Sequence, residues 1–171
     1  MKRYNETHVL ALDVRHSRFG YALFSGPKRL LDRGASTVPS QCSDRAGWIR
    51  QRMALLLQHG APSSIVMKQL RRARLSGNTD GVPILNAIRL AAKEHGIPMY
   101  VIGREEIESV FHVFHARTKE EIARAVVGIF PELLGRLPPI RKKWQPEAHG
   151  MIVFDAIATG IAYWQMPASR T

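Results

Sequence analysis

The sequence predicts an α/β fold in which a mixed five-stranded sheet is flanked by helices. Apolar runs at residues 8–14 and 19–25, and a third expected strand at 29–36, follow one another with only short polar turns between them, which is typical of an antiparallel meander. Further along, the apolar runs 63–70 and 99–103 are separated by one amphipathic helix, which predicts a right-handed parallel crossover. A meander joined to a parallel pair gives a mixed sheet whose faces need helices.

The first two strands, 8–14 and 19–25, are rich in Val, Leu, Tyr and Phe. The polar turn "RHSR" joins the first strand to the second, and the turn signal "SGPK" precedes the third. Turns this short leave room only for a reversal of the chain, so neighbouring strands are expected to pair antiparallel.

Two amphipathic helices are expected on either side of strand 63–70. The first covers residues 44–58, where apolar residues recur at helical spacing, with Ser43 as its expected N-cap and His59-Gly60 at its end. The second covers 82–94 and stops at "HGIP". Asp80, just before it, is interpreted as an N-cap.

The second half of the chain is expected to be mainly helical. Its segments are two helices near 104–113 and 118–130, a loop rich in Pro and basic residues at 131–147, and a last helix at 150–165. Thr118 and Glu121 form a capping box at the second helix. The last helix is mostly apolar and must therefore be buried.

The net charge of the chain indicates the class of molecule that it binds. The chain has 171 residues, enough for one domain spanning 1–171, with a formal net charge of +11 from 25 Lys and Arg against 14 Asp and Glu. So large an excess favours a polyanion such as nucleic acid, although a merely basic protein would carry it too.

The cellular compartment is predicted from the cysteine count and from the lack of a signal segment or membrane helix in the sequence. Cys42 is the single cysteine, which excludes an internal disulfide and fits a reducing environment. The N-terminal "MKRYNETH" has no apolar signal segment, and no apolar run reaches the roughly 20 residues of a membrane helix. We expect a cytoplasmic protein without a membrane partner.

Two carboxylates stand in apolar surroundings. Asp13 lies at the end of the first strand, and Asp155 lies in the last helix among Ile152, Ala156 and Ala158, where burial of a charge is costly. The order of elements together with these two residues resembles the RNase H-like superfamily, and within it the RuvC-type Holliday-junction resolvases. The matching stretches are "VLALDVRHSRFGYALF", "SSIVMKQL", "RTKEEIARAVVGIFPEL" and "FDAIATGIAYW", which follow the family's order.

This resemblance implies a metal-dependent endonuclease acting on branched or structured DNA, and a homodimer. The family holds two divalent ions, Mg²⁺ or Mn²⁺, at four acidic or histidine positions, and such ions activate water and stabilise the leaving oxygen. Asp13 and Asp155 match two of these positions and are the expected metal ligands.

The other two expected ligands are replaced. Lys68 stands where the family has Glu, and Ile152 where it has Asp or His. An ammonium binds no metal, and beside Asp13 it would neutralise the carboxylate, so Lys68→Glu is expected to restore metal binding. If the strand is shifted by one residue, Gln69 faces the site instead, because adjacent strand residues point to opposite sides.

Glu147 and His149 are candidate replacement ligands. If the chain bends at His149-Gly150, one of them is able to swing toward Asp155 and assist catalysis. If the helix begins earlier, Glu147 is too far along it to share an ion and is a first-turn carboxylate favoured by the helix dipole. His149 is then an ordinary residue at the start of the helix.

Two basic segments flank the expected site, and we interpret them as nucleic-acid contacts. They contain Arg71, Arg72 and Arg74 in "RRAR", and Arg141, Lys142, Lys143 and Trp144 in "RKKWQ". Arg and Lys bind phosphates without reading sequence. Trp144 either stacks on an unpaired base or pins its loop to the protein.

Two functions remain open at this point. One is the metal-dependent endonuclease, and the other is a nucleic-acid-binding protein that keeps the fold but has lost the two-metal site. A sugar-kinase-like phosphotransferase is disfavoured, because the chain is too short for two lobes and lacks a Gly-rich phosphate loop.

Overall fold

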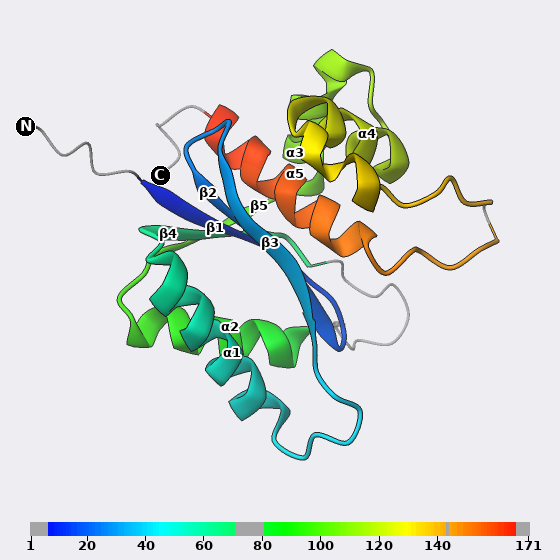
Figure 1. The fold of residues 1–171 in the computed structure, drawn as a ribbon. Helices are drawn as coiled ribbons and strands as arrows, with labels where there is room; N and C mark the ends of the chain where they lie inside the picture. Colours follow the sequence, from blue (N-terminus) through cyan, green and yellow to red (C-terminus); the bar gives the residue numbers. More distant parts are fainter. Residues whose placement is uncertain (1–6, 71–80, 143, 167–171) are drawn as a thin grey trace, which may run out of the picture.

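The computed structural model describes residues 7–70, 81–142 and 144–166. Its sheet has five strands in the order β3-β2-β1-β4-β5 (Figure 1). They are β1 (His8–Val14), β2 (Arg18–Ser25), β3 (Leu30–Thr37), β4 (Ser64–Lys68) and β5 (Met99–Ile102). β1, β2 and β3 form the predicted antiparallel meander, and β1, β4 and β5 run parallel as predicted.

Helices cover both faces of the sheet (Figure 1). One face carries α1 (Arg45–Gly60) and α2 (Val82–Glu94), and the other carries α5 (Met151–Gln165) with α3 (Arg104–Phe111) and α4 (Lys119–Ile129) outside it. Two short 3₁₀ helices are η1 (His112–Phe114) and η2 (Pro131–Arg136). No helix among the described residues is long and apolar enough to span a membrane.

β1 contributes to two separate cores because it is buried on both faces. Val9 and Ala11 pack into the core under α5, and Leu10 and Leu12 pack into the core under α1 and α2. Alternate residues of a strand point to opposite faces, so a strand covered on both sides must be apolar throughout. Asp13 is the exception among the buried residues of this strand, and it lies on the face covered by α5.

Details of the helix ends differ in part from the expectation. Asp44, not Ser43, caps α1, because its Oδ1 accepts a hydrogen bond from the Gly47 amide at 2.8 Å. The capping box of α4 is confirmed. The segment 131–147, expected to be a loop, begins with η2. Asp80, the expected N-cap of α2, lies outside the described residues.

Close approach of α5 to the sheet depends on Gly20. A Cβ atom at this position would lie 2.3 Å from the carbonyl oxygen of Ile152, in the first turn of α5. Gly20 is also the antiparallel partner of Asp13. The missing side chain therefore lets the start of α5 settle directly beside Asp13.

Gly20→Ala is expected to destabilise the protein by about 1–3 kcal/mol, the usual cost of forcing extra atoms into a packed interior. Gly128→Ala is the control, because it lies in α4 where an added methyl group would meet open space, and it should gain up to about 1 kcal/mol from helix propensity. Urea unfolding of both variants measures the difference. Equal stability of the two would contradict a close α5 contact.

Candidate functional site

Asp13 and Asp155 are brought together by the packing of α5 on β1. Asp13 lies near the end of β1 and Asp155 in the second turn of α5, and their exposed fractions are only 4% and 6%. The two carboxylates expected at one site therefore lie together in the structure. What joins them, however, is an arginine.

Arg15 bridges the two carboxylates. Its Nε donates to Asp13 Oδ2 at 2.8 Å, and its Nη2 donates to Asp155 Oδ2 at 2.7 Å. Arg15 follows Asp13 by two residues, so both side chains point to the same face of the sheet. The guanidinium thus occupies the space between the carboxylates that a shared metal ion would need.

Lys68 points at the same site. It is the last residue of β4, and its Nζ lies 3.2 Å from Asp155 Oδ1. Of the two registers considered for this strand, the one that turns Lys68 rather than Gln69 toward Asp155 is therefore observed. Ile152, the other replaced position, is fully buried and packs its backbone against Gly20.

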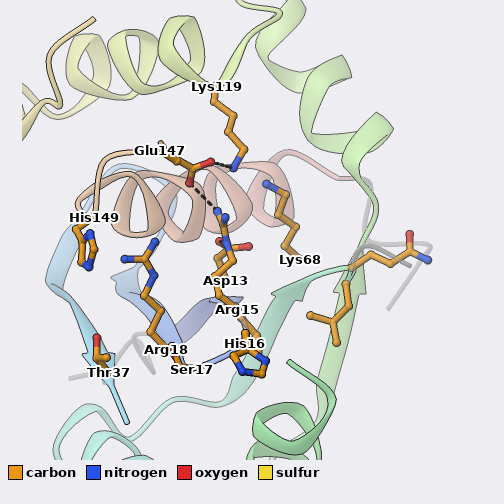
Figure 2. Close-up of a pocket in the computed structure, with 13 residues that line it drawn as sticks. Asp13, Arg15, His16, Ser17, Arg18, Thr37, Lys68, Lys119, Glu147 and His149 are labelled. Atoms are coloured by element: carbon orange, nitrogen blue, oxygen red, sulfur yellow. Dashed lines mark hydrogen bonds and ion pairs between the residues drawn. The ribbon is translucent and has the colours of Figure 1, made fainter. Parts of the chain in front are cut away.

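Glu147 reaches the site because the chain turns at His149-Gly150 before α5 begins. Its Oε2 accepts from Lys119 Nζ at 2.7 Å, and its Oε1 lies 3.1 Å from Arg15 Nη2 (Figure 2). Lys119 Nζ also lies 3.0 Å from Asp155 Oδ2. His149 is exposed at the pocket wall and is not part of these contacts.

These contacts form one ion-pair cluster, consisting of Asp13, Arg15, Lys68, Lys119, Glu147 and Asp155. Three carboxylates face three cations, so its formal charge is zero. Asp155 contacts all three cations, whereas Asp13 contacts only Arg15 within the cluster.

The surroundings shift the pKa values of the two aspartates in opposite directions. Burial, together with the nearby charge of Asp155, raises the pKa of Asp13. Burial also acts to raise the pKa of Asp155, but Lys68, Lys119 and Arg15 outweigh it and lower the pKa below its ordinary value. The pKa of Glu147 is lowered despite its partial burial, because Lys119 and Arg15 lie beside it. Asp155 is therefore the electrostatic centre of the cluster.

The donor set does not fit the two divalent ions that the resemblance implies. Hard cations need free carboxylate oxygens, and here ammonium and guanidinium groups already occupy oxygens of all three carboxylates. In the part of the chain that the structure describes, no group of three or more His, Cys, Asp or Glu side chains is arranged to hold a metal. The site is built from ion pairs.

Part of the predicted nucleic-acid surface falls outside the described residues, namely Arg71, Arg72, Arg74 and Lys143. Arg141 is described, and its Nε pairs with Glu120 Oε1 at 2.9 Å. Lys142 lies over the ring of Trp144, with its Nζ 5.7 Å from the ring centroid. Trp144 is 76% exposed, so it does not pin the loop to the protein.

Arg15 and Lys119 were missed by the sequence reasoning, although each carried a signal. Arg15 stands two residues after a buried aspartate, at the spacing that places two side chains on one side of a strand. Lys119 is the first residue of α4, where a cation opposes the positive end of the helix dipole. A cation in that position is mildly unfavourable by itself, and a nearby carboxylate offsets that cost.

Comparison with solved structures identifies the fold. RuvC of Thermus thermophilus, solved alone and in complex with a Holliday junction substrate, matches with a TM-score of 0.68 and 22% identity. The alignment covers 91% of this chain and 91–92% of RuvC. The yeast mitochondrial Holliday junction resolvase Ydc2 matches with a TM-score of 0.55 and 15% identity, covering 95% of this chain and 80% of Ydc2.

Sequence comparison adds no relative. No family model matches the chain. No curated protein matches it either. The five-stranded mixed sheet and the structural likeness establish an RNase H-like fold of the RuvC type.

Proposed function

We propose that this protein binds nucleic acid through a RuvC-like fold and does not cleave it by metal catalysis. The observation that carries this proposal is the ion-pair cluster. Arg15, Lys68 and Lys119 engage the carboxylates that a two-metal nuclease of this fold would use as ligands. Two further metal charges about 4 Å apart would have to displace three cations already in place.

Binding to nucleic acid is supported by the net charge and by the exposed Trp144. The chain has a formal net charge of +11, which draws it to polyanions. Lys142 and Gln145 are joined by two hydrogen bonds, at 2.8 and 3.0 Å, and Trp144 is exposed to solvent. An exposed aromatic ring among basic residues suits stacking on an unpaired base.

The proposal predicts binding without cleavage. Fluorescence anisotropy with a four-way junction, a duplex and a single strand should give affinities that fall linearly on a log–log plot between about 50 and 200 mM salt. The same DNA incubated with Mg²⁺ or Mn²⁺ should stay intact, with the wild type and with Asp13→Asn alike. A resolvase of established activity serves as the positive control for cleavage.

Two results would contradict this function. Wild-type cleavage that disappears in Asp13→Asn would make the chain a metal-dependent nuclease and would require the cluster to rearrange around metal. Absence of binding to every nucleic acid at low salt would remove the binding function itself. Trp144→Ala separates the stacking contribution, since base stacking on an aromatic ring is worth about 1–3 kcal/mol and is greatest on DNA with unpaired bases.

A further inference from the structure

An open pocket of about 680 Å³ lies beside the ion-pair cluster (Figure 2). Besides members of the cluster, its wall includes Ser17, Arg18, Thr37 and His149. The cluster balances its own charges, so it leaves no cation in excess. Among the described residues that line the pocket, Arg18 supplies the unbalanced positive charge.

Arg18 differs from Arg15 in its contacts. Its side chain makes no hydrogen bond or ion pair with any described residue, and Figure 2 shows its guanidinium directed into the pocket near His149. Arg15, only three residues earlier, contacts three carboxylates. Charge-assisted hydrogen bonds are the strong ones, and no described residue engages the donors of Arg18 in them.

The backbone that carries Arg18 is held in place. Arg15 N donates to Arg18 O at 2.8 Å, which closes the turn between β1 and β2. Val38 N donates to Ser17 O at 2.8 Å, and Arg18 pairs with Thr37 in the β2–β3 ladder. A guanidinium on a fixed strand end loses less freedom on binding than one on a mobile loop.

We propose that Arg18 binds a backbone phosphate of the nucleic acid, an inference that rests on the proposed function. A planar guanidinium fits two phosphate oxygens at once, and the hydroxyls of Ser17 and Thr37 line the same wall as additional donors. The cations of the cluster are occupied by carboxylates, so the phosphate is drawn to the guanidinium that no described carboxylate holds. The pocket thus contacts the sugar–phosphate backbone rather than the bases.

The test compares Arg18→Gln with Arg89→Gln in junction-DNA binding over a salt series. Arg89 is exposed on α2, on the opposite face of the sheet, and its loss changes the net charge equally. Arg18→Gln should weaken binding about three- to tenfold and reduce the salt slope by about 1, the value of one phosphate contact, whereas Arg89→Gln should leave the slope unchanged. Arg18→Lys keeps the charge, so it should retain the slope with a smaller loss of affinity.

A second measurement distinguishes binding of a DNA phosphate from binding of free inorganic phosphate. The arginine Nε–Hε NMR signal of Arg18 should move on addition of DNA and much less with inorganic phosphate at matched ionic strength. Equal shifts with both would overturn the inference, because Arg18 would then be a general anion site. Wild-type binding with an unchanged slope in Arg18→Gln would overturn it and leave the proposed function standing. Failure of the wild type to bind any nucleic acid would instead reject the function on which it rests.

Discussion

Asp155→Asn is expected to lower the free energy of unfolding by about 3–5 kcal/mol at neutral pH, the usual cost of removing one partner from a buried ion pair. Asp155 is almost fully buried and contacts all three cations of the cluster. Without its charge, three cations would face the two remaining carboxylates. Urea unfolding in buffer containing a chelator measures the change without any contribution from metal.

Asp13→Asn is the matched comparison, because Asp13 is as deeply buried but contacts only Arg15 within the cluster. Burial raises the pKa of Asp13, which means that its ionised form is disfavoured in the folded protein. We therefore expect a loss of no more than about 1 kcal/mol, close to the net value of one hydrogen bond. In a site of unpaired carboxylates, both substitutions would stabilise the protein by relieving repulsion, and that result would contradict the ion-pair cluster.

The pH dependence of stability follows from the same pKa directions. A carboxyl with a lowered pKa in the folded state contributes stability above its ordinary pKa and loses it as the pH falls through the folded value. Asp155 and Glu147 are of this kind, so their contributions should begin to fall below pH 3.8 and 4.5, their ordinary pKa values, and be lost as the pH passes through the lower folded values. Asp13 has a raised pKa and opposes this trend, because its protonation favours the folded state. Asp155→Asn should accordingly flatten the acid limb of the stability curve.

A double-mutant cycle assigns the loss to the cluster. Lys68→Met in the Asp155→Asn background restores the balance of charges and should recover part of the lost stability. Coupling between contacting charged residues is commonly about 1–3 kcal/mol. Zero coupling would mean that Lys68 does not interact with Asp155 in solution.

The fold could be predicted from the sequence because its signals are local. Short turns between β1, β2 and β3 leave only antiparallel pairing, and one helix between β4 and β5 leaves only a parallel crossover. The continuous apolar character of α5 required burial, and α5 is buried. The differences are the cap of α1 and the short helix η2 in a segment expected to be a loop.

The site was predictable in part because its members come from distant segments. Asp13 and Asp155 stand out as charges in apolar surroundings, and Lys68 stands out at a strand end that resembles a ligand position. Glu147 depends on the path of the loop before α5, which no local pattern fixes. Lys119 begins an ordinary capped helix, and only the packing of α4 on α5 shows that it meets Asp155.

The same geometry changes the expectation for Lys68→Glu. Taken alone, this substitution removes one cation and adds an oxygen ligand, but Arg15 still bridges Asp13 and Asp155. A metal ion would have to displace that guanidinium from two buried carboxylates. We therefore expect the single variant to gain little metal affinity, and the double variant Lys68→Glu/Arg15→Ala to gain clearly.

In the double variant, four carboxylates would face Lys119 as the one remaining cation of the cluster. Without metal, their repulsion should destabilise the protein. Mg²⁺ or Mn²⁺ should then restore stability by about 2.7 kcal/mol when its concentration is 100 times the Kd, because an ion that binds only the folded state shifts unfolding by mass action. We expect one ion per chain, since Lys119 still holds Asp155 and Glu147 and leaves no room for a second.

Thermal melting over a Mn²⁺ series, with calorimetric titration for stoichiometry, measures this effect. Arg89→Ala/Lys93→Glu is the control, because it makes the same change in net charge on the exposed surface of α2. The site variant should bind Mn²⁺ at least about tenfold more tightly than the control, a difference of about 1.4 kcal/mol. Equal affinities would show that added negative charge alone attracts the ion. A wild type that binds Mn²⁺ as tightly as the double variant would show that metal displaces Arg15 and Lys68 unaided, and would return the chain to the metal-dependent nucleases.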